Sequence, residues 1–192
     1  MEEISDQQLI KECLKGDQRS FKALYERYQG YVYSICIRYA VSPQAVKDQM
    51  QVIFMETFQS LDRYDSTKAA FKTWMTRIAI NQIIHQKRKR NFDYSVESLE
   101  DYSVINSEYH VSVDWEIDQK ELYAILNKMP EKYATAFNLS IIEGYSHSEI
   151  AELLGVPQST TRVLVHRGRI WAMNQLKVYL QDTTTPCLKL NP

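Results

Sequence analysis

The sequence has few of the residues that break helices, cross-link chains or span membranes. Its 192 residues include only five glycines, five prolines and three cysteines. The cysteines, Cys13, Cys36 and Cys187, are odd in number and far apart, so we expect reduced thiols in a cytoplasmic protein and no structural zinc. No stretch approaches the roughly 20 apolar residues that span a bilayer, and the acidic, polar start of the chain argues against a signal peptide.

Motifs for catalysis and cofactor binding are also missing. The chain has no Walker loop, GxSxG, HExxH or paired Cys/His cluster, and its four histidines lack ligand spacing. Most carboxylates lie in one polar segment or on the polar faces of expected helices. We therefore predict a protein that is not an enzyme and that binds no cofactor or metal.

The charges are nearly balanced overall but unevenly distributed. The net charge is −1, yet residues 62–90 hold eight Lys/Arg against two acids. Residues 91–118 hold eight acids and no Lys/Arg, and residues 153–181 hold four Lys/Arg and no acid. Two basic modules separated by an acidic segment are typical of a nucleic-acid-binding protein.

Helical periodicity dominates the chain, and we predict no strand. Apolar stripes begin at Leu9 and Phe21, Pro43 marks another helix start, and a long basic helix is expected from about residue 70 to residue 90. The predicted fold class is all-α, with two small helical domains joined by a flexible acidic linker. We place the domains at residues 5–92 and 115–180, the linker at residues 93–114 and a frayed tail at residues 181–192.

A helix-turn-helix is expected between residues 143 and 169. Ser146 and Glu149 match a capping box, Gly155 allows a tight turn, and Pro157 suits the first turn of a second helix. On that helix, 100° per residue turns four small or apolar side chains inward: Thr161, Val165, Gly168 and Ala172. The side chains expected to contact duplex DNA point outward or lie on the flank: Ser159, Thr160, Arg162, Val163, His166, Arg167 and Arg169. The alternative is a solvated helix in an ordinary bundle.

The basic helix from residue 71 to residue 90 is the second candidate DNA-binding surface. Its predicted apolar face comprises Phe71, Trp74, Met75 and Ile78. The opposite face and the preceding loop carry groups suited to single-stranded DNA: Arg63, Tyr64, Lys72, Thr73, Arg77, Asn81, Lys87 and Arg88. Two alternatives remain, namely that Trp74 packs in the core and that the run at residues 87–90 is a solvated helix end.

Together, these segments resemble the extracytoplasmic-function (ECF) group of the sigma-70 family of bacterial RNA polymerase sigma factors. The N-terminal part is similar to region 2 of that family, through Asp48-x-x-Gln51-x-x-Phe54, Leu61-Asp-Arg-Tyr64 and Phe71-x-x-Trp74-x-x-Arg77-Ile-Ala-x-Asn81. The C-terminal part is similar to region 4, through Met129-Pro130, Glu143-Gly-Tyr-Ser and His166-Arg-Gly-Arg169.

The resemblance implies two DNA contacts and several protein partners. Region 2 would bind the β′ clamp helices of core RNA polymerase through Asp48, Gln51 and Phe54. It would also capture the melted non-template strand of the −10 element, with Asn81 contacting a flipped base. Region 4 would read the −35 element as duplex and contact the β flap, and the linker would thread the polymerase's positively lined channel. An anti-sigma factor would cover these faces, and no part of the chain would insert into a membrane.

Four residues depart from the family pattern. Gln49 and Val52 lie on the helix expected to meet β′, and His85 replaces a common Asp. Leu164 stands where the second helix of the helix-turn-helix, which we call the reading helix, usually has Arg. We expect Leu164 and Trp171 either to pack on the helix near residues 130–142 or to form an apolar patch for a protein partner. Under either interpretation we expect −35 recognition to be weaker than usual for the family and specificity to rest more on the −10 element. Leu164→Arg should then strengthen −35 binding if the site allows the longer side chain.

Two other functions are compatible with these patterns. One is a helix-turn-helix regulator that binds duplex operators without polymerase. The other is a degenerate sigma factor that sequesters a partner. Run-off transcription with core polymerase distinguishes all three.

Overall fold

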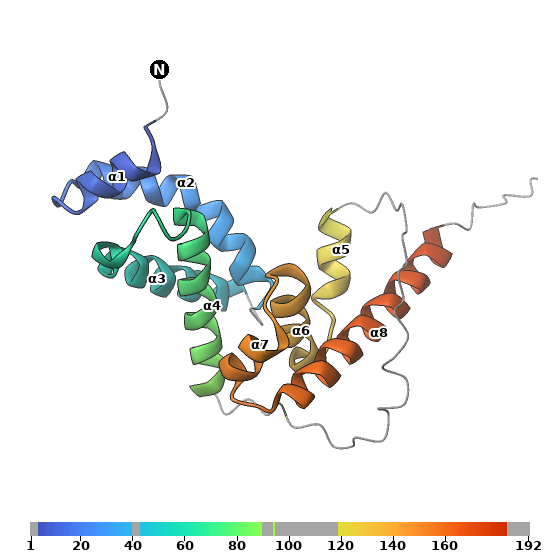
Figure 1. Ribbon diagram of the computed structural model, residues 1–192. Coiled ribbons are helices and arrows are strands. Elements are labelled where there is room, and N and C mark those ends of the chain that lie inside the picture. Colours follow the sequence, from blue (N-terminus) through green and yellow to red (C-terminus); the bar gives the residue numbers. More distant parts are fainter. Residues whose placement is uncertain (1–3, 40–42, 90–93, 95–118, 184–192) are drawn as a thin grey trace, which may run out of the picture. The chain divides into compact units, whose positions relative to one another are not determined.

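The computed structural model describes residues 4–39, 43–89, 94 and 119–183 of the chain (Figure 1). The chain divides into two compact units, residues 1–92 and 93–192. The described residues form helices and no strand, as the predicted all-α class requires. The predicted linker lies outside the described residues except for Tyr94. Residues 181–183 of the predicted tail are helical, so the helix ends later than we expected.

The N-terminal unit contains the elements α1 (Asp6–Cys13), α2 (Gln18–Ile37), α3 (Pro43–Gln59), η1 (Leu61–Arg63) and α4 (Phe71–Lys89). The first two helices begin at capping side chains. The Ser5 hydroxyl accepts the Gln8 N–H at 3.3 Å, and the Asp17 carboxylate accepts the Ser20 N–H at 2.9 Å. Each bond satisfies a donor that the first helical turn leaves open. Gly16 between them has a φ of 89°, in the left-handed region that favours glycine.

The core of this unit lies among α2, α3 and α4, which pack against one another. Its largest apolar side chains are at most 2% exposed: Leu24, Val32, Ile35, Ile53, Met75, Ile80, Ile83 and Ile84. The start of α3 at Pro43 and the extent of α4 confirm two predicted helices. Because α2 and α3 pack against the inner face of α4, they hold its outer face in position at the surface.

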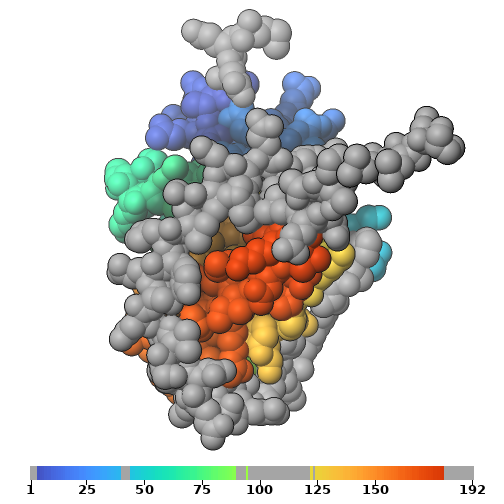
Figure 2. All heavy atoms as spheres, turned by 90° about the vertical axis from the view of Figure 1, so that its right-hand side faces the viewer, coloured from blue at the N-terminus to red at the C-terminus, as the bar shows by residue number. Residues whose placement is uncertain are grey.

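The C-terminal unit contains α5 (Gln119–Leu126), α6 (Glu131–Phe137), the π-helical turn η3 (Asn138–Ile142), α7 (His147–Leu154) and α8 (Gln158–Thr183). Helix α8 packs against α5, α6 and α7. Figure 2 shows α8 beside α5 on one face of this unit. Met129, Phe137 and Ala172 form a buried cluster, against which Trp171 packs.

Helices α7 and α8 form the predicted helix-turn-helix. The capping box is present, because the Ser146 hydroxyl accepts the Glu149 N–H at 3.3 Å and the Glu149 carboxylate accepts the Ser146 N–H at 2.8 Å. Gly155 ends α7 with a φ of 69°, which makes the tight turn possible. The Thr161 hydroxyl on α8 lies 3.2 Å from the His147 carbonyl oxygen and hydrogen-bonds to it, so it ties the two helices together.

No helix within the described ranges is long and apolar enough to cross a membrane.

Candidate nucleic-acid interface

Helix α4 presents a polar, basic face to solvent. Thr73, Arg77 and Asn81 follow one another at four-residue spacing and are all exposed, as are Lys72 and Arg88. Phe71 and Met75, on the inner face, are 3% and 1% exposed. The predicted orientation of this helix is therefore confirmed, and the remaining inner-face residues Trp74 and Ile78 are partly exposed. Lys87 is 6% exposed, so a phosphate contact by Lys87 requires its side chain to be uncovered.

The loop between η1 and α4 is held by its own hydrogen bonds. The Asp65 carboxylate accepts both the Thr67 N–H at 2.9 Å and the Thr67 hydroxyl at 2.7 Å, and these bonds lower the pKa of Asp65. The Tyr64 hydroxyl donates to the Ala69 carbonyl at 3.1 Å. Arg63, at the end of η1, is exposed. Hydrogen bonds among its own residues thus close the loop beside the basic face.

A cluster of aromatic rings joins the first residue of this loop, Tyr64, to α4. The ring centroid of Tyr64 lies 5.4 Å from those of Phe71 and Trp74, and the Phe71 and Trp74 centroids are 5.8 Å apart. These separations are typical of favourable aromatic pairs. Trp74 therefore packs against its neighbours, as the core alternative expected, and keeps part of its surface exposed.

Tyr31 on α2 also belongs to the basic face, although no sequence pattern indicated it. The Lys72 ammonium lies 4.3 Å from the centroid of the Tyr31 ring, within cation–π range. The Tyr31 hydroxyl lies 2.7 Å from the Thr76 hydroxyl on α4. The contact joins residues more than 40 positions apart, so local periodicity cannot reveal it. Tyr31 limits the freedom of a side chain predicted to contact DNA.

The reading helix α8 has the predicted two faces. Thr161, Val165, Gly168 and Ala172 are buried, as expected. A Cβ added at Gly168 would lie 3.0 Å from the Phe137 Cβ, so α8 approaches α6 as closely as glycine allows.

The candidate DNA contacts on α8 differ in exposure. Ser159, Arg162 and Arg169 are exposed, whereas Thr160, His166 and Arg167 are partly exposed. Val163, which we expected to point into solvent, is 7% exposed, so a base contact by Val163 requires it to be uncovered.

Leu164 is fully buried, at 0% exposure. This outcome matches the packing interpretation and contradicts the alternative of an exposed patch for a protein partner. It also removes the basis for expecting Leu164→Arg to strengthen −35 binding, because an arginine there would place its charge inside the C-terminal unit.

The predicted polymerase contacts on α3 are divided between the surface and the core. Asp48 and Gln51 are exposed, and the Gln44 amide donates to the Asp48 carboxylate at 2.8 Å. Phe54 is 5% exposed and its ring centroid lies 4.6 Å from that of Tyr25, so Phe54 belongs to the interior of this unit. Gln49, interpreted above as a departure on the partner-facing helix, is 7% exposed. Val52 is partly exposed, and His85 on α4 is exposed.

His147, the first residue of α7, lies near two arginines of α8. Burial lowers the pKa of His147, and the charges of Arg162 and Arg169 lower it further. Arg162 and Arg169, both candidate DNA contacts, therefore lie close enough to His147 to act on its charge. Within the described ranges, no group of three His, Cys, Asp or Glu side chains is arranged to hold a metal ion.

Comparison with known proteins places both surfaces in one family. The sigma-70 region 2 model matches residues 24–92 and the sigma-70 region 4 model matches residues 119–171, one in each unit. The two matches define a protein with both DNA-binding regions of the sigma-70 class. The ECF RNA polymerase sigma factor SigW of Bacillus subtilis is 32% identical over 179 residues, covering 88% of this chain and 95% of that protein. The chain belongs to the ECF sigma factors of the sigma-70 family.

Other relatives agree with this assignment. The ECF RNA polymerase sigma-E factor of Escherichia coli K12 is 29% identical over 179 residues, covering 88% of this chain and 92% of that protein. A solved structure of the sigma factor RpoE from Bartonella quintana, in complex with the anti-sigma factor NepR, is 20% identical. It covers 83% of this chain and 98% of the solved chain, with a TM-score of 0.51, and it supports the same fold.

Proposed function

We propose that this chain is a promoter-recognition subunit of RNA polymerase, which binds the core enzyme, recognises the −35 and −10 elements and helps to melt the DNA. The observation that carries the proposal is the presence of two different DNA-binding surfaces in a sigma-70 chain. One is the exposed face of α4 with its ordered loop, and the other is the basic helix-turn-helix of α7 and α8. In this proposal the polymerase supplies the catalysis, and the protein works in the cytoplasm.

The α4 face suits the melted −10 strand. Arg77 and Arg88 are exposed for phosphate contacts, and Asn81 offers both a donor and an acceptor to an unpaired base. Extruding a base from the duplex costs a few kcal/mol of stacking, which contacts at the surface must offset. Loop 64–69 is already closed by internal hydrogen bonds, so little additional ordering is needed when the strand binds.

The α8 face suits duplex −35 DNA. Arg162, Arg167 and Arg169 lie along the first turns of the reading helix, where side chains reach base edges and phosphates. The hydroxyls of Ser159 and Thr160 supply further hydrogen-bonding groups at the start of that helix. Arginine contacts to guanine specify sequence, whereas phosphate contacts position the helix.

Protein partners are expected on both units. We propose that Asp48 and Gln51 contact the β′ clamp helices and that the C-terminal unit contacts the β flap. The buried Phe54 ring packs against the rings of Tyr25 and Phe58 and thereby helps to hold α3 in position for the β′ contact. The solved structure above pairs a sigma factor with an anti-sigma factor, and we propose that an inhibitor of that kind covers the same faces.

Run-off transcription with purified core polymerase tests the proposal. Promoters are selected from random-sequence DNA, and transcript is measured with and without the protein. We expect transcript only when the protein is present. Asn81→Ala should reduce transcript, whereas the control Lys22→Ala, an exposed lysine paired with Glu26 on α2, should not. Duplex binding without transcription would indicate a helix-turn-helix regulator. Polymerase binding with neither duplex binding nor transcription would indicate a degenerate sigma factor.

A further inference from the structure

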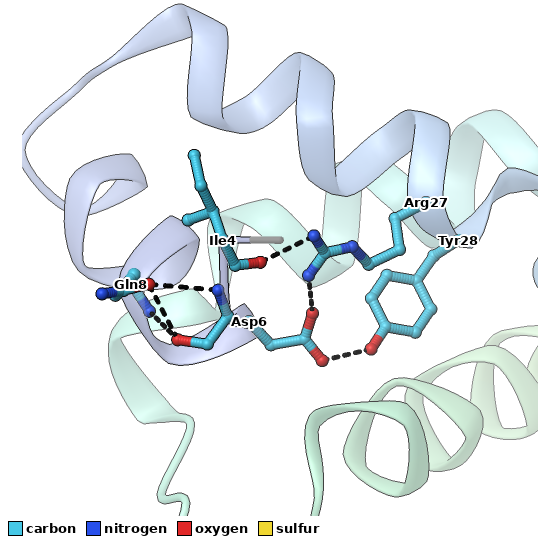
Figure 3. Close-up of polar contacts among 6 residues, drawn as sticks. Ile4, Asp6, Gln8, Arg27 and Tyr28 are labelled. Atoms are coloured by element: carbon cyan, nitrogen blue, oxygen red, sulfur yellow. Dashed lines mark hydrogen bonds and ion pairs between the residues drawn. The ribbon is translucent and has the colours of Figure 1, made fainter. Parts of the chain in front are cut away.

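The N-terminal segment is tied to α2 mainly through the carboxylate of Asp6 (Figure 3). The Arg27 Nη1 donates to Asp6 Oδ1 at 2.6 Å, and the Tyr28 hydroxyl donates to the other Asp6 oxygen. The Arg27 Nη2 donates to the Ile4 carbonyl at 2.7 Å. The Asp6 and Arg27 side chains are 30% and 27% exposed, so this pair is better shielded from water than an ordinary surface ion pair.

Tyr28 connects this carboxylate to the aromatic cluster under the loop. Tyr28 is 9% exposed, and its ring meets the Phe71 ring edge-on with the centroids 5.2 Å apart. Phe71 in turn contacts Tyr64 and Trp74. The Tyr64 hydroxyl then closes loop 64–69 through Ala69. A continuous series of contacts therefore runs from the first turn of α1 to the loop beside the α4 face.

The hydroxyl of Tyr28 is a permanent donor in this arrangement. Burial, then the hydrogen bond to Asp6, raises the pKa of Tyr28 well above its usual range. The Tyr28 hydroxyl thus bonds to Asp6 while the Tyr28 ring makes its edge-on contact with Phe71. Losing the Asp6 acceptor leaves a mostly buried hydroxyl unpaired, which favours a shift of the whole Tyr28 side chain relative to Phe71.

We propose that Asp6 is a positioning residue for capture of the −10 strand. It holds Tyr28 in place, and Tyr28 acts through Phe71 to set the positions of Tyr64 and Trp74 beside the loop. The inference rests on the proposed role of the α4 face. Asp6 lies outside the residues 24–92 that the region 2 model matches. Holding the loop in its binding conformation reduces the ordering that strand binding requires.

Three variants of the full chain, each assembled with core polymerase, test the proposal. Asp6→Asn weakens the acceptor, Tyr28→Phe removes only the hydroxyl, and the control Glu12→Gln removes an exposed ion pair with Lys15 on the same helix α1. The ligands are the −10 non-template strand and the −35 duplex from a promoter that the unmodified protein transcribes. We expect Asp6→Asn and Tyr28→Phe each to weaken −10 strand binding about 3- to 10-fold, as one hydrogen bond allows. Binding of the −35 duplex should be unchanged, and Glu12→Gln should change neither.

Two further readouts separate positioning from general destabilisation. The double variant of Asp6 and Tyr28 should bind the −10 strand no more weakly than the worse single variant, because both changes break one connection. In a background with Trp115 and Trp171 replaced by Phe, the emission of Trp74 should shift to longer wavelength in Asp6→Asn, with helical circular dichroism unchanged.

Several outcomes would overturn the inference. One is −10 strand binding within twofold of the unmodified protein in both Asp6→Asn and Tyr28→Phe. Another is a parallel loss of −10 binding, −35 binding and thermal stability, which would make Asp6 a general stabilising residue. Failure of the unmodified protein to bind the −10 strand would instead contradict the proposed function itself, and the inference would fall with it.

Discussion

Replacing Leu164 by arginine tests the packing of the reading helix. Leu164 is 0% exposed, so its removal forfeits about 1.5–3 kcal/mol of apolar burial. A guanidinium in the same space adds a desolvation cost of several kcal/mol. The sum is comparable with the total stability of a small domain, about 5–15 kcal/mol. We therefore expect Leu164→Arg to unfold the C-terminal unit and to abolish −35 duplex binding.

Two milder substitutions at the same position calibrate the effect. Leu164→Met nearly conserves volume and should cost less than about 1.5 kcal/mol. Leu164→Ala should cost about 2–5 kcal/mol, depending on how far the site collapses. Urea unfolding of the full chain, followed by circular dichroism, should rank the variants Met, Ala, Arg in order of increasing loss of stability. Gel shifts on the −35 duplex should give the same order.

A different result for arginine would refute this reasoning. If Leu164→Arg unfolds at the same urea concentration as the unmodified protein and binds the −35 duplex more tightly, the side chain at this position reaches solvent. The helix face assigned to the core would then be wrong, and the expectation drawn from the family pattern would be restored.

Three other measurements follow from the described contacts. Ser146→Ala removes the cap of α7 and should lower the stability of the C-terminal unit by about 0.5–2 kcal/mol in urea unfolding, whereas an unchanged midpoint would show that water replaces the cap. The folded-state pKa of His147 lies below 6.5, so the unfolded state binds more protons as pH falls below that value. Stability should therefore decline on acidification from about pH 7 to pH 5, and His147→Gln should reduce that decline; equal declines would assign it to other groups. Replacing Arg88 and Lys89 by Gln should reduce the salt slope of polymerase–promoter binding by roughly two units, and an unchanged slope would make them a solvated helix end.

Local features of the fold were predictable from sequence because their causes are local. The capping box at Ser146 and Glu149 requires only two side chains three residues apart, and the structure confirms it. The buried face of α8 follows from a fixed 100° turn per residue, which correctly predicted that Thr161 and Val165 are buried. The exposed face of α4 was predicted for the same reason.

Features that depend on packing between distant segments were not predictable. The bonds from Asp6 to Arg27 and Tyr28 join residues 21 and 22 positions apart, and no periodic pattern indicates them. The burial of Gln49 likewise depends on which neighbours cover α3, so the family pattern placed on the partner-facing side a residue that is 7% exposed. The π-helical turn η3 has no sequence signal that we recognised.

The division of the chain into residues 1–92 and 93–192 has a consequence for its synthesis. The helices of the first unit pack on one another within a short span of sequence, and domains with such local contacts fold in microseconds to milliseconds. Translation of residues 93–192 at roughly 5–20 residues per second takes on the order of ten seconds. The first unit therefore has time to fold while the second is still being made. A substitution that prevents the second unit from folding should leave behind a nascent chain whose first half is already native.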